Sequence, residues 1–184
     1  MPHRRWKLAN VILSLGLLSL VGINLQLALG HNWDTWHWHT GRDILTYGPR
    51  GSYTTEATRA LNEWDGNTDV NFPRSSSYQE MAVYGYNYGG TGWAGLASVS
   101  GEFDSHGKQI TSCKARYNTY YNKPWWDPGW WFTSDSEWRR GVYCQEIGHC
   151  LGLAHSNDGC MGMGYYNKQT RTTSHNRSDV NAKF

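Results

Sequence analysis

Residues 145–155 read Gln-Glu-Ile-Gly-His-Cys-Leu-Gly-Leu-Ala-His, and this short stretch decides how the rest of the chain is interpreted. On a helix, residues four apart share a face, so Gln145 and His149 point the same way, with the intervening glutamate beside them. Gly152 allows a sharp turn, which brings His155 back toward the same point. Three converging donors with an adjacent carboxylate are typical of a catalytic zinc site, in which the fourth position stays open.

The helix that carries this stretch is predicted to run from about 135 to 151. Ser134 and Glu137 match a capping box, in which each side chain covers a free backbone amide. Gly152 is placed as a left-handed terminator. Behind the cap, apolar residues recur at mostly helical spacing: Val142, Ile147, Cys150 and Leu151.

The stretch resembles the metzincin signature H-E-x-x-H-x-x-G-x-x-H, and within it the matrixin type, which commonly reads HEIGHxLGLxHS. Only the first histidine of that signature differs, because Gln145 replaces it. Metzincins also have a methionine turn below the metal, and Cys160-Met161 fits that position, with Met163 as the alternative. The Cys-Gln-Glu opening followed by a Cys-Met turn is similar to a group of exported bacterial relatives. The matching residues are Glu146, His149, Gly152 and His155.

The resemblance implies an α+β fold of the zincin type. Its parts are a mixed twisted sheet, a backing helix, a long active-site helix and a methionine turn after the third ligand. It also implies a secreted zinc endopeptidase that cleaves polypeptides with a metal-bound water. Gln145, His149 and His155 are then the Zn²⁺ ligands and Glu146 is the general base.

Substrate recognition is also suggested by the resemblance. In metzincins the strand that borders the cleft pairs with extended substrate, and an edge strand offers the free backbone groups for this pairing. Residues Trp93, Gly95 and Leu96 belong to our candidate strand. The other interpretation is an ordinary strand packed on the core.

Gln145 leaves two functions open. An amide oxygen is a neutral, harder and weaker zinc ligand than an imidazole. In the first hypothesis it completes the site of a working peptidase. In the second the protein is a weak or inactive relative that binds peptide or carbohydrate. The presence of Glu146 favours the first, because a pure binding module has no chemical use for a carboxylate there.

The first 30 residues are predicted to be a signal peptide. A basic start at Arg4, Arg5 and Lys7 precedes an apolar run over 8–29 and a small-residue end at Gly30. An uncleaved membrane anchor is the alternative, since the run is long enough to span a bilayer. Cleavage would leave 31–184 as one exported metallopeptidase-like domain, without stable membrane anchoring, which we expect to be a monomer.

Charge argues against a nucleic-acid partner. Three of the 17 Lys and Arg residues lie in the first 30, so 14 remain against 15 Asp and Glu, and the exported part has no basic excess. The chain is rich in aromatic residues, with 11 Trp and 12 Tyr, whose rings suit half-buried strands, clefts and sugar-binding surfaces.

Four cysteines in an exported chain indicate two disulfides, and spacing alone allows three pairings. A zinc site of four cysteines is the rival interpretation, but the chain has no CxxC pair. We favour Cys144–Cys160, which would tie the metal helix to the methionine turn. Cys113–Cys150 would then fasten a strand to the same helix.

Residues before the metal helix predict strands and one further helix. Strands are expected at the start of 33–47 and over 81–88, 93–99 and 110–120, where polar and apolar residues alternate. Turns are expected at 48–51, 89–92 and 104–107, and a loop at 122–132. A helix over 53–65 is indicated by the helical spacing of Ala57, Ala60, Leu61 and Trp64.

Other candidates have simpler explanations. His37 and His39 could hold a second metal, but are better interpreted as the polar side of an aromatic strand, and His106 and His175 as solvated side chains. A group of tryptophans could form a sugar-stacking platform, although packing around the active helix explains them better. These are Trp125, Trp126, Trp130 and Trp131.

Overall fold

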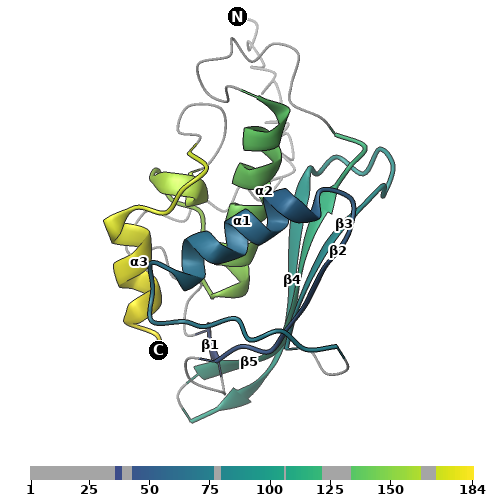
Figure 1. Cartoon of the computed structure of the whole chain (residues 1–184). Coiled ribbons are helices and arrows are strands. Elements are labelled where there is room, and N and C mark those ends of the chain that lie inside the picture. Colours follow the sequence, from purple (N-terminus) through teal and green to yellow (C-terminus); the bar gives the residue numbers. More distant parts are fainter. Residues whose placement is uncertain (1–35, 39–42, 77–79, 106, 122–133, 163–168) are drawn as a thin grey trace, which may run out of the picture.

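The computed structural model of the chain describes residues 36–38, 43–76, 80–105, 107–121, 134–162 and 169–184. These residues form a mixed five-stranded sheet, three α-helices and one short 3₁₀ turn (Figure 1). The elements are β1 (Trp36–Trp38), β2 (Thr46–Gly51), α1 (Thr54–Asp65), β3 (Met81–Tyr86), β4 (Gly95–Asp104), β5 (Gly107–Asn118), α2 (Asp135–Cys150), η1 (Gly159–Met161) and α3 (Ser174–Asn181).

The sheet is parallel except at one edge. β2 pairs with β3, and β3 and β1 pair in parallel with successive parts of β5. β4 runs antiparallel to β5 along almost its whole length. Because β3 and β4 pair with the same part of β5, they must lie on its opposite sides. Within the described residues, β4 is therefore an edge strand of the sheet.

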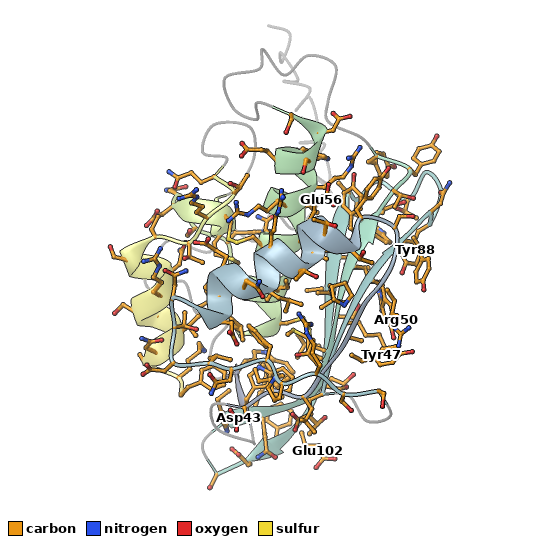
Figure 2. All side chains as sticks on the ribbon, viewed as in Figure 1. Asp43, Tyr47, Arg50, Glu56, Tyr88 and Glu102 are labelled. Carbon is orange, nitrogen blue, oxygen red and sulfur yellow. A yellow bond between two sulfur atoms is a disulfide. The ribbon has the colours of Figure 1, made fainter. Side chains whose placement is uncertain are left out.

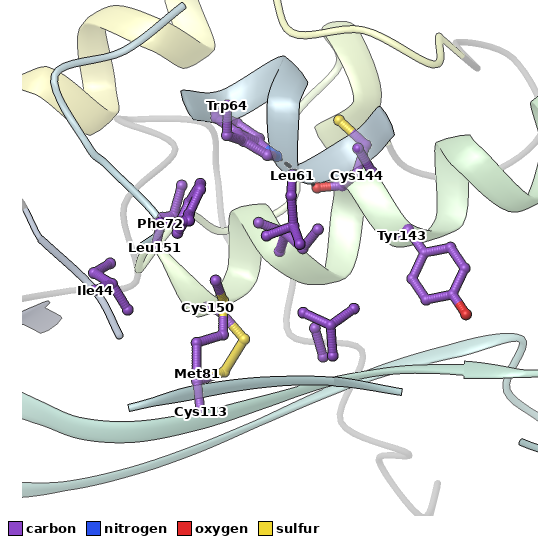
Figure 3. Close-up of a cluster of buried hydrophobic side chains, with 14 of the residues drawn as sticks. Ile44, Leu61, Trp64, Phe72, Met81, Cys113, Tyr143, Cys144, Cys150 and Leu151 are labelled. Carbon is purple, nitrogen blue, oxygen red and sulfur yellow. Dashed lines mark hydrogen bonds between the residues drawn. A yellow bond between two sulfur atoms is a disulfide. The ribbon is translucent and has the colours of Figure 1, made fainter. Parts of the chain in front are cut away.

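Helices α1 and α2 cover the same face of the sheet, and the core lies between them and the strands (Figure 1, Figure 3). Alternate residues of a strand point to opposite faces, so Met81 and Val83 of β3 both reach this core. Trp64 of α1 is fully buried, and its indole N–H donates to the Cys144 carbonyl at 3.0 Å. This bond satisfies the polar edge of a large apolar ring inside the core.

The two predicted helices are confirmed. In α1 all four predicted apolar residues are fully buried, and Gly66 follows its end. At the start of α2, the Ser134 hydroxyl accepts a hydrogen bond from the Glu137 backbone at 3.2 Å, as expected of a capping serine. Helix α2 thus begins directly after Ser134, the cap that the sequence predicted.

One expectation was wrong. The segment 48–51 is not a turn but the second part of β2, which pairs with β3 through a register shift between Tyr47 and Arg50. Pro49 has no N–H to donate, and a bulge allows the strand to continue past it. The sequence analysis made no prediction for the polar tail, where α3 begins at a full capping box between Thr173 and Asn176.

The β4–β5 hairpin is longer than the sequence indicated. The strands were expected over 93–99 and 110–120, whereas they meet from Gly95 to Asp104 and from Gly107 to Asn118. The exposed polar residues near its tip lack a buried apolar face, so their alternation gave no signal. The predicted strand within 33–47 is short, since β1 covers three residues.

Both disulfides join α2 to other elements. Cys150 is bonded to Cys113 of β5, and Cys144 is bonded to Cys160 of η1. This is the pairing that the sequence analysis favoured. The first bond holds the end of α2 on the sheet (Figure 3), and the second holds the turn with Met161 against the middle of α2.

In the described part of the chain, no helix is long and apolar enough to cross a membrane. The predicted signal segment, the loop 122–132 and Met163 lie outside the described residues.

The Cys113–Cys150 bond closes the longer loop and should contribute more to stability. The double variant Cys113→Ser with Cys150→Ser is expected to lose about 4 kcal/mol of unfolding free energy, from the loop entropy of 37 residues. For Cys144→Ser with Cys160→Ser and a separation of 16, the loss should be about 3 kcal/mol. Urea unfolding measures both, and unchanged midpoints would contradict this role.

Candidate metal centre

The end of α2 is a Schellman turn. Gly152 has φ +82°, a left-handed conformation that glycine adopts without strain. The Gly152 N–H donates to the His149 carbonyl at 3.0 Å, and the Leu153 N–H donates to the Gly148 carbonyl at 3.1 Å. The predicted terminator is confirmed, and the chain reverses there toward the helix it has just left.

This reversal brings the two predicted histidines together. The Nε2 atoms of His149 and His155 are 3.0 Å apart, and the two rings meet edge to face. The Nδ1 atom of His149 lies 2.8 Å from the Leu153 carbonyl, which can only accept a hydrogen bond. Nδ1 must therefore carry the proton, and the free lone pair of His149 is on Nε2, facing His155.

This pair of rings fits a zinc ion. Two imidazole ligands of a tetrahedral zinc at about 2.1 Å have nitrogens about 3.4 Å apart, so a small outward movement of the rings from 3.0 Å would admit the ion. Burial and the neighbouring His155 lower the pKa of His149 to about 4, and loss of hydration lowers the pKa of His155. Both rings are therefore neutral at neutral pH, the form that binds metals. Metal-binding histidines also typically donate their second N–H to a carbonyl, as His149 does.

The third predicted ligand is held nearby. Gln145 lies one helical turn before His149 and is half-buried. Its amide nitrogen donates to the Gly162 carbonyl at 3.2 Å, just beyond η1. Within the described residues no group of three or more His, Cys, Asp or Glu is placed to hold a metal. A third protein ligand from this part of the chain would have to be a group of another type, and Gln145 is the one that the sequence analysis named.

Glu146 is buried between α2 and the edge strand. A hydrogen bond from the Ala97 backbone holds its carboxyl, and burial raises its pKa to about 8 despite that bond. Residue 95 has no room for a side chain, because a Cβ on Gly95 would overlap the Glu146 carboxyl and lie 2.6 Å from Val142 Cγ1. A cation on the neighbouring imidazoles would favour the charged carboxylate.

Met161, the predicted methionine-turn residue, packs against α2 at Gly148. It is fully buried, and a Cβ on Gly148 would overlap its sulfur and lie 2.8 Å from Trp64 Cζ2. The turn closes through the Ser156 N–H, which donates to the Met161 carbonyl at 2.8 Å. Gly148 thus allows the methionine and the metal helix to approach closely.

The candidate substrate strand borders this site. Gly95 and Leu96 begin β4, the edge strand, and Gly95 contacts Glu146 directly. Trp93 precedes the strand, and its ring packs on Tyr88 at 5.2 Å. The described residues therefore place Gly95 and Leu96 beside the site, while Trp93 belongs to an aromatic group at the loop.

The other histidine candidates do not join the site. His37 contacts Asp104 at 3.0 Å at the far end of the hairpin. His175 of α3 is exposed and lies 3.7 Å from Asp158 and 3.6 Å from Asp179. His39, His106 and the four candidate tryptophans of the loop lie outside the described residues.

Three groups that orient the site were missed by the sequence analysis. They are backbone groups: the carbonyls of Leu153 and Gly162 and the N–H of Ala97. Any residue except proline supplies both groups, so no side-chain pattern could have identified them.

Comparisons with known proteins give little further information. No family model matches the chain, and a search of curated proteins finds no match. Among solved structures, that of myroilysin overlaps 79% of this chain and 75% of its own chain, with 14% identity and a TM-score of 0.41. A similarity at this level carries no functional argument, so the function is inferred from the side chains of the site.

The left-handed turn at Gly152 should control metal binding. Gly152→Ala is expected to cost about 1–2 kcal/mol, because alanine at a positive φ is strained. Its Cβ would also lie 3.1 Å from the Trp36 carbonyl. We expect His155 to move away from His149 and zinc affinity to fall, measured by competition with a chelating dye. Gly90→Ala is the control, since its Cβ meets ordinary contacts at 3.7 Å, and an equal effect of both would contradict the role of the turn.

Proposed function

We propose that the chain is a secreted zinc endopeptidase of the metzincin type. The observation that carries the proposal is the 3.0 Å approach of the His149 and His155 Nε2 atoms, with His149 oriented by the Leu153 carbonyl. The lone pair on Nε2 of His149 can accept a hydrogen bond from the Nε2–H tautomer of His155, or both Nε2 atoms can bind one cation once that proton is on Nδ1 of His155. Zinc is the ion that imidazole ligands and an adjacent glutamate suit best.

In this proposal Gln145, His149 and His155 hold the ion, with Gln145 contributing its amide oxygen. When bound, zinc polarises a peptide carbonyl and lowers the pKa of a water. The amide nitrogen of Gln145 donates to the Gly162 carbonyl, so the ligand in this proposal is the amide oxygen. The amide oxygen is the remaining polar atom of that side chain.

Glu146 performs the proton transfers. Its carboxylate accepts the proton of the water that attacks the peptide carbonyl, and then donates it to the leaving amine. The Ala97 N–H orients the carboxyl group, and the backbone of Gly95 lies against it. Burial excludes bulk water from the carboxyl, which strengthens its interaction with a nearby cation.

The polypeptide substrate would bind along β4. The described residues leave the outer side of this strand without a partner strand, so its backbone groups can pair with an extended peptide. Gly95 and Leu96 then lie next to the scissile bond, because Gly95 contacts Glu146. Trp93 would bind a more distant part of the peptide.

Export is part of the same proposal. Residues 1–30 would be removed as a signal peptide, and 31–184 would act outside the cell as one domain and as a monomer. The two disulfides support this setting, since such bonds persist in oxidising compartments.

A weak or inactive relative that binds peptide or carbohydrate is the second candidate function. The observation that favours it is the amide of Gln145, because an amide binds zinc more weakly than the imidazole at this position of the metzincin signature.

The two functions are separated by Glu146→Gln. A working peptidase is expected to lose about 10²–10⁴-fold in kcat/KM on a quenched fluorescent peptide while it retains its zinc. Zinc is measured by atomic emission on dialysed protein. His175→Ala is the matched control, because this exposed side chain should change neither quantity. Equal cleavage by Glu146→Gln and the unaltered protein would exclude the peptidase function.

Gln145 has a test of its own. Gln145→His should raise the zinc affinity, because it adds a third imidazole, and Gln145→Leu should abolish stable binding. Calorimetric titration of the metal-free protein with zinc measures both. The same affinity for Gln145→Leu and the unaltered protein would show that this side chain is not a ligand.

A further inference from the structure

The face of the sheet opposite to the helices carries a continuous group of aromatic rings. On β3, Met81 and Val83 face the core, so Tyr84 and Tyr86 face outward. Figure 2 shows Tyr47 and Tyr88 on the side of the strands away from α1. We call this group the aromatic row: Tyr47, Tyr84, Tyr86, Tyr88 and Trp93.

Each ring of the aromatic row contacts the next. The centroid distances are 6.5 Å from Tyr47 to Tyr84, 6.0 Å from Tyr84 to Tyr86, 6.4 Å from Tyr86 to Tyr88 and 5.2 Å from Tyr88 to Trp93. All five side chains are half-buried or exposed, and Tyr86 has 46% of its surface exposed. The rings therefore form one accessible row on this face of the sheet. The distance between neighbouring ring centres is similar to the length of one pyranose unit of a polysaccharide.

The loop that carries two of these rings is fixed by Asn118 of β5. This side chain is fully buried and accepts hydrogen bonds from the Tyr88 and Tyr120 N–H groups at 3.0 and 3.1 Å. Its amide nitrogen donates to the carbonyls of Gly89 and Trp93 at 2.9 and 3.3 Å. The aromatic row is thus preorganised, which reduces the entropy lost when a ligand binds.

Cationic side chains border the aromatic row. Arg50 stacks over Tyr47 at 4.7 Å, and Arg116 and Lys114 project from the outward positions of β5. The outward positions of β3, β5 and the first half of β4 carry no acidic side chain. Glu102 lies at the far end of the hairpin (Figure 2). This face is therefore positive, although the exported part of the chain has no basic excess.

A hollow at one end of the aromatic row contains two guanidinium groups. Its volume is about 460 Å³, and its lining includes Arg50, Arg74, Ser75 and Ser76. Arg74 is held in place because its guanidinium donates to the Gly48 carbonyl at 2.9 Å. A planar guanidinium recognises a carboxylate through paired hydrogen bonds, and serine hydroxyls suit the hydroxyls of a sugar.

We propose that this face binds a linear polysaccharide that bears carboxylates, with sugar rings on the aromatic row and carboxylates at Arg50, Arg74 and Arg116. Sugars offer C–H faces for stacking on rings and hydroxyls for hydrogen bonds to tyrosine and serine, and both kinds of group are present here. The acidic character follows from Arg50, Arg116 and Lys114 around the row, whereas Arg74 also interacts with Asp65.

Other partners fit this face less well. A nucleic acid is held mainly by many phosphate contacts, and the few cations here are widely spaced. A membrane surface requires side chains that enter the acyl region, whereas this face exposes tyrosines whose hydroxyls are polar. The outward rings of β3 lie on the opposite side of the sheet from α2, and Trp93 is the one residue that the aromatic row shares with the proposed peptide site. Polysaccharide binding therefore does not require peptidase activity.

The proposal is tested with alginate, a polyuronate. Calorimetry measures its affinity for residues 31–184 at two salt concentrations. Tyr86→Ala removes the most exposed ring and should weaken binding about fivefold. Arg50→Gln should weaken it by a similar factor and reduce its dependence on salt, because one ion pair is lost. Glu146→Gln should bind alginate as the unaltered chain does, which separates this test from the test of peptidase activity.

Matched controls lie elsewhere on the molecule. Phe103→Ala removes a ring that is 82% exposed at the hairpin, and Arg59→Gln removes an exposed charge from α1. Neither should change alginate binding, and thermal unfolding would verify that all variants fold. The proposal would be overturned if the chain did not bind alginate. It would also be overturned if Tyr86→Ala and Arg50→Gln bound alginate with the same affinity as the unaltered chain does. Binding of dextran, oligothymidylate or phosphatidylglycerol vesicles as strong as that of alginate would overturn it as well.

Discussion

The left-handed turn at Gly152 is the constraint on which the candidate site depends. It ends α2 with two backbone hydrogen bonds and sends the chain back along the helix, so that His155 reaches His149. The same reversal puts the Leu153 carbonyl beside Nδ1 of His149, which fixes the proton of that ring on Nδ1. One backbone conformation thus sets both the distance between the two rings and the nitrogen that is free to bind a cation.

The rest of the core holds α2 in place for that turn. Two disulfides join it to β5 and to η1, and Trp64 donates to its backbone from α1. Met161 packs against Gly148 of the same helix. Glu146 faces the edge strand β4, where the Ala97 backbone donates a hydrogen bond to its carboxyl group.

The sequence predicted the elements whose signals are local. The cap at Ser134, the apolar face of α1 and the glycine after α2 depend on residues a few positions apart, and all three were confirmed. The β2 strand was missed because Gly48 and Pro49 suggest a turn, and only pairing with β3 overrides that preference. Alternation over 81–88 predicted the β3 strand, but the path of the chain from Tyr88 to Trp93 depends on Asn118, more than twenty residues away.

The central claim is that the two imidazoles and the Gln145 amide share one metal ion. A crystal structure of the protein grown with zinc, with anomalous data collected on both sides of the zinc edge, tests it most directly. We predict one strong anomalous peak bonded to Nε2 of His149, Nε2 of His155 and Oε1 of Gln145. A peak elsewhere, or none between these rings, would contradict the account.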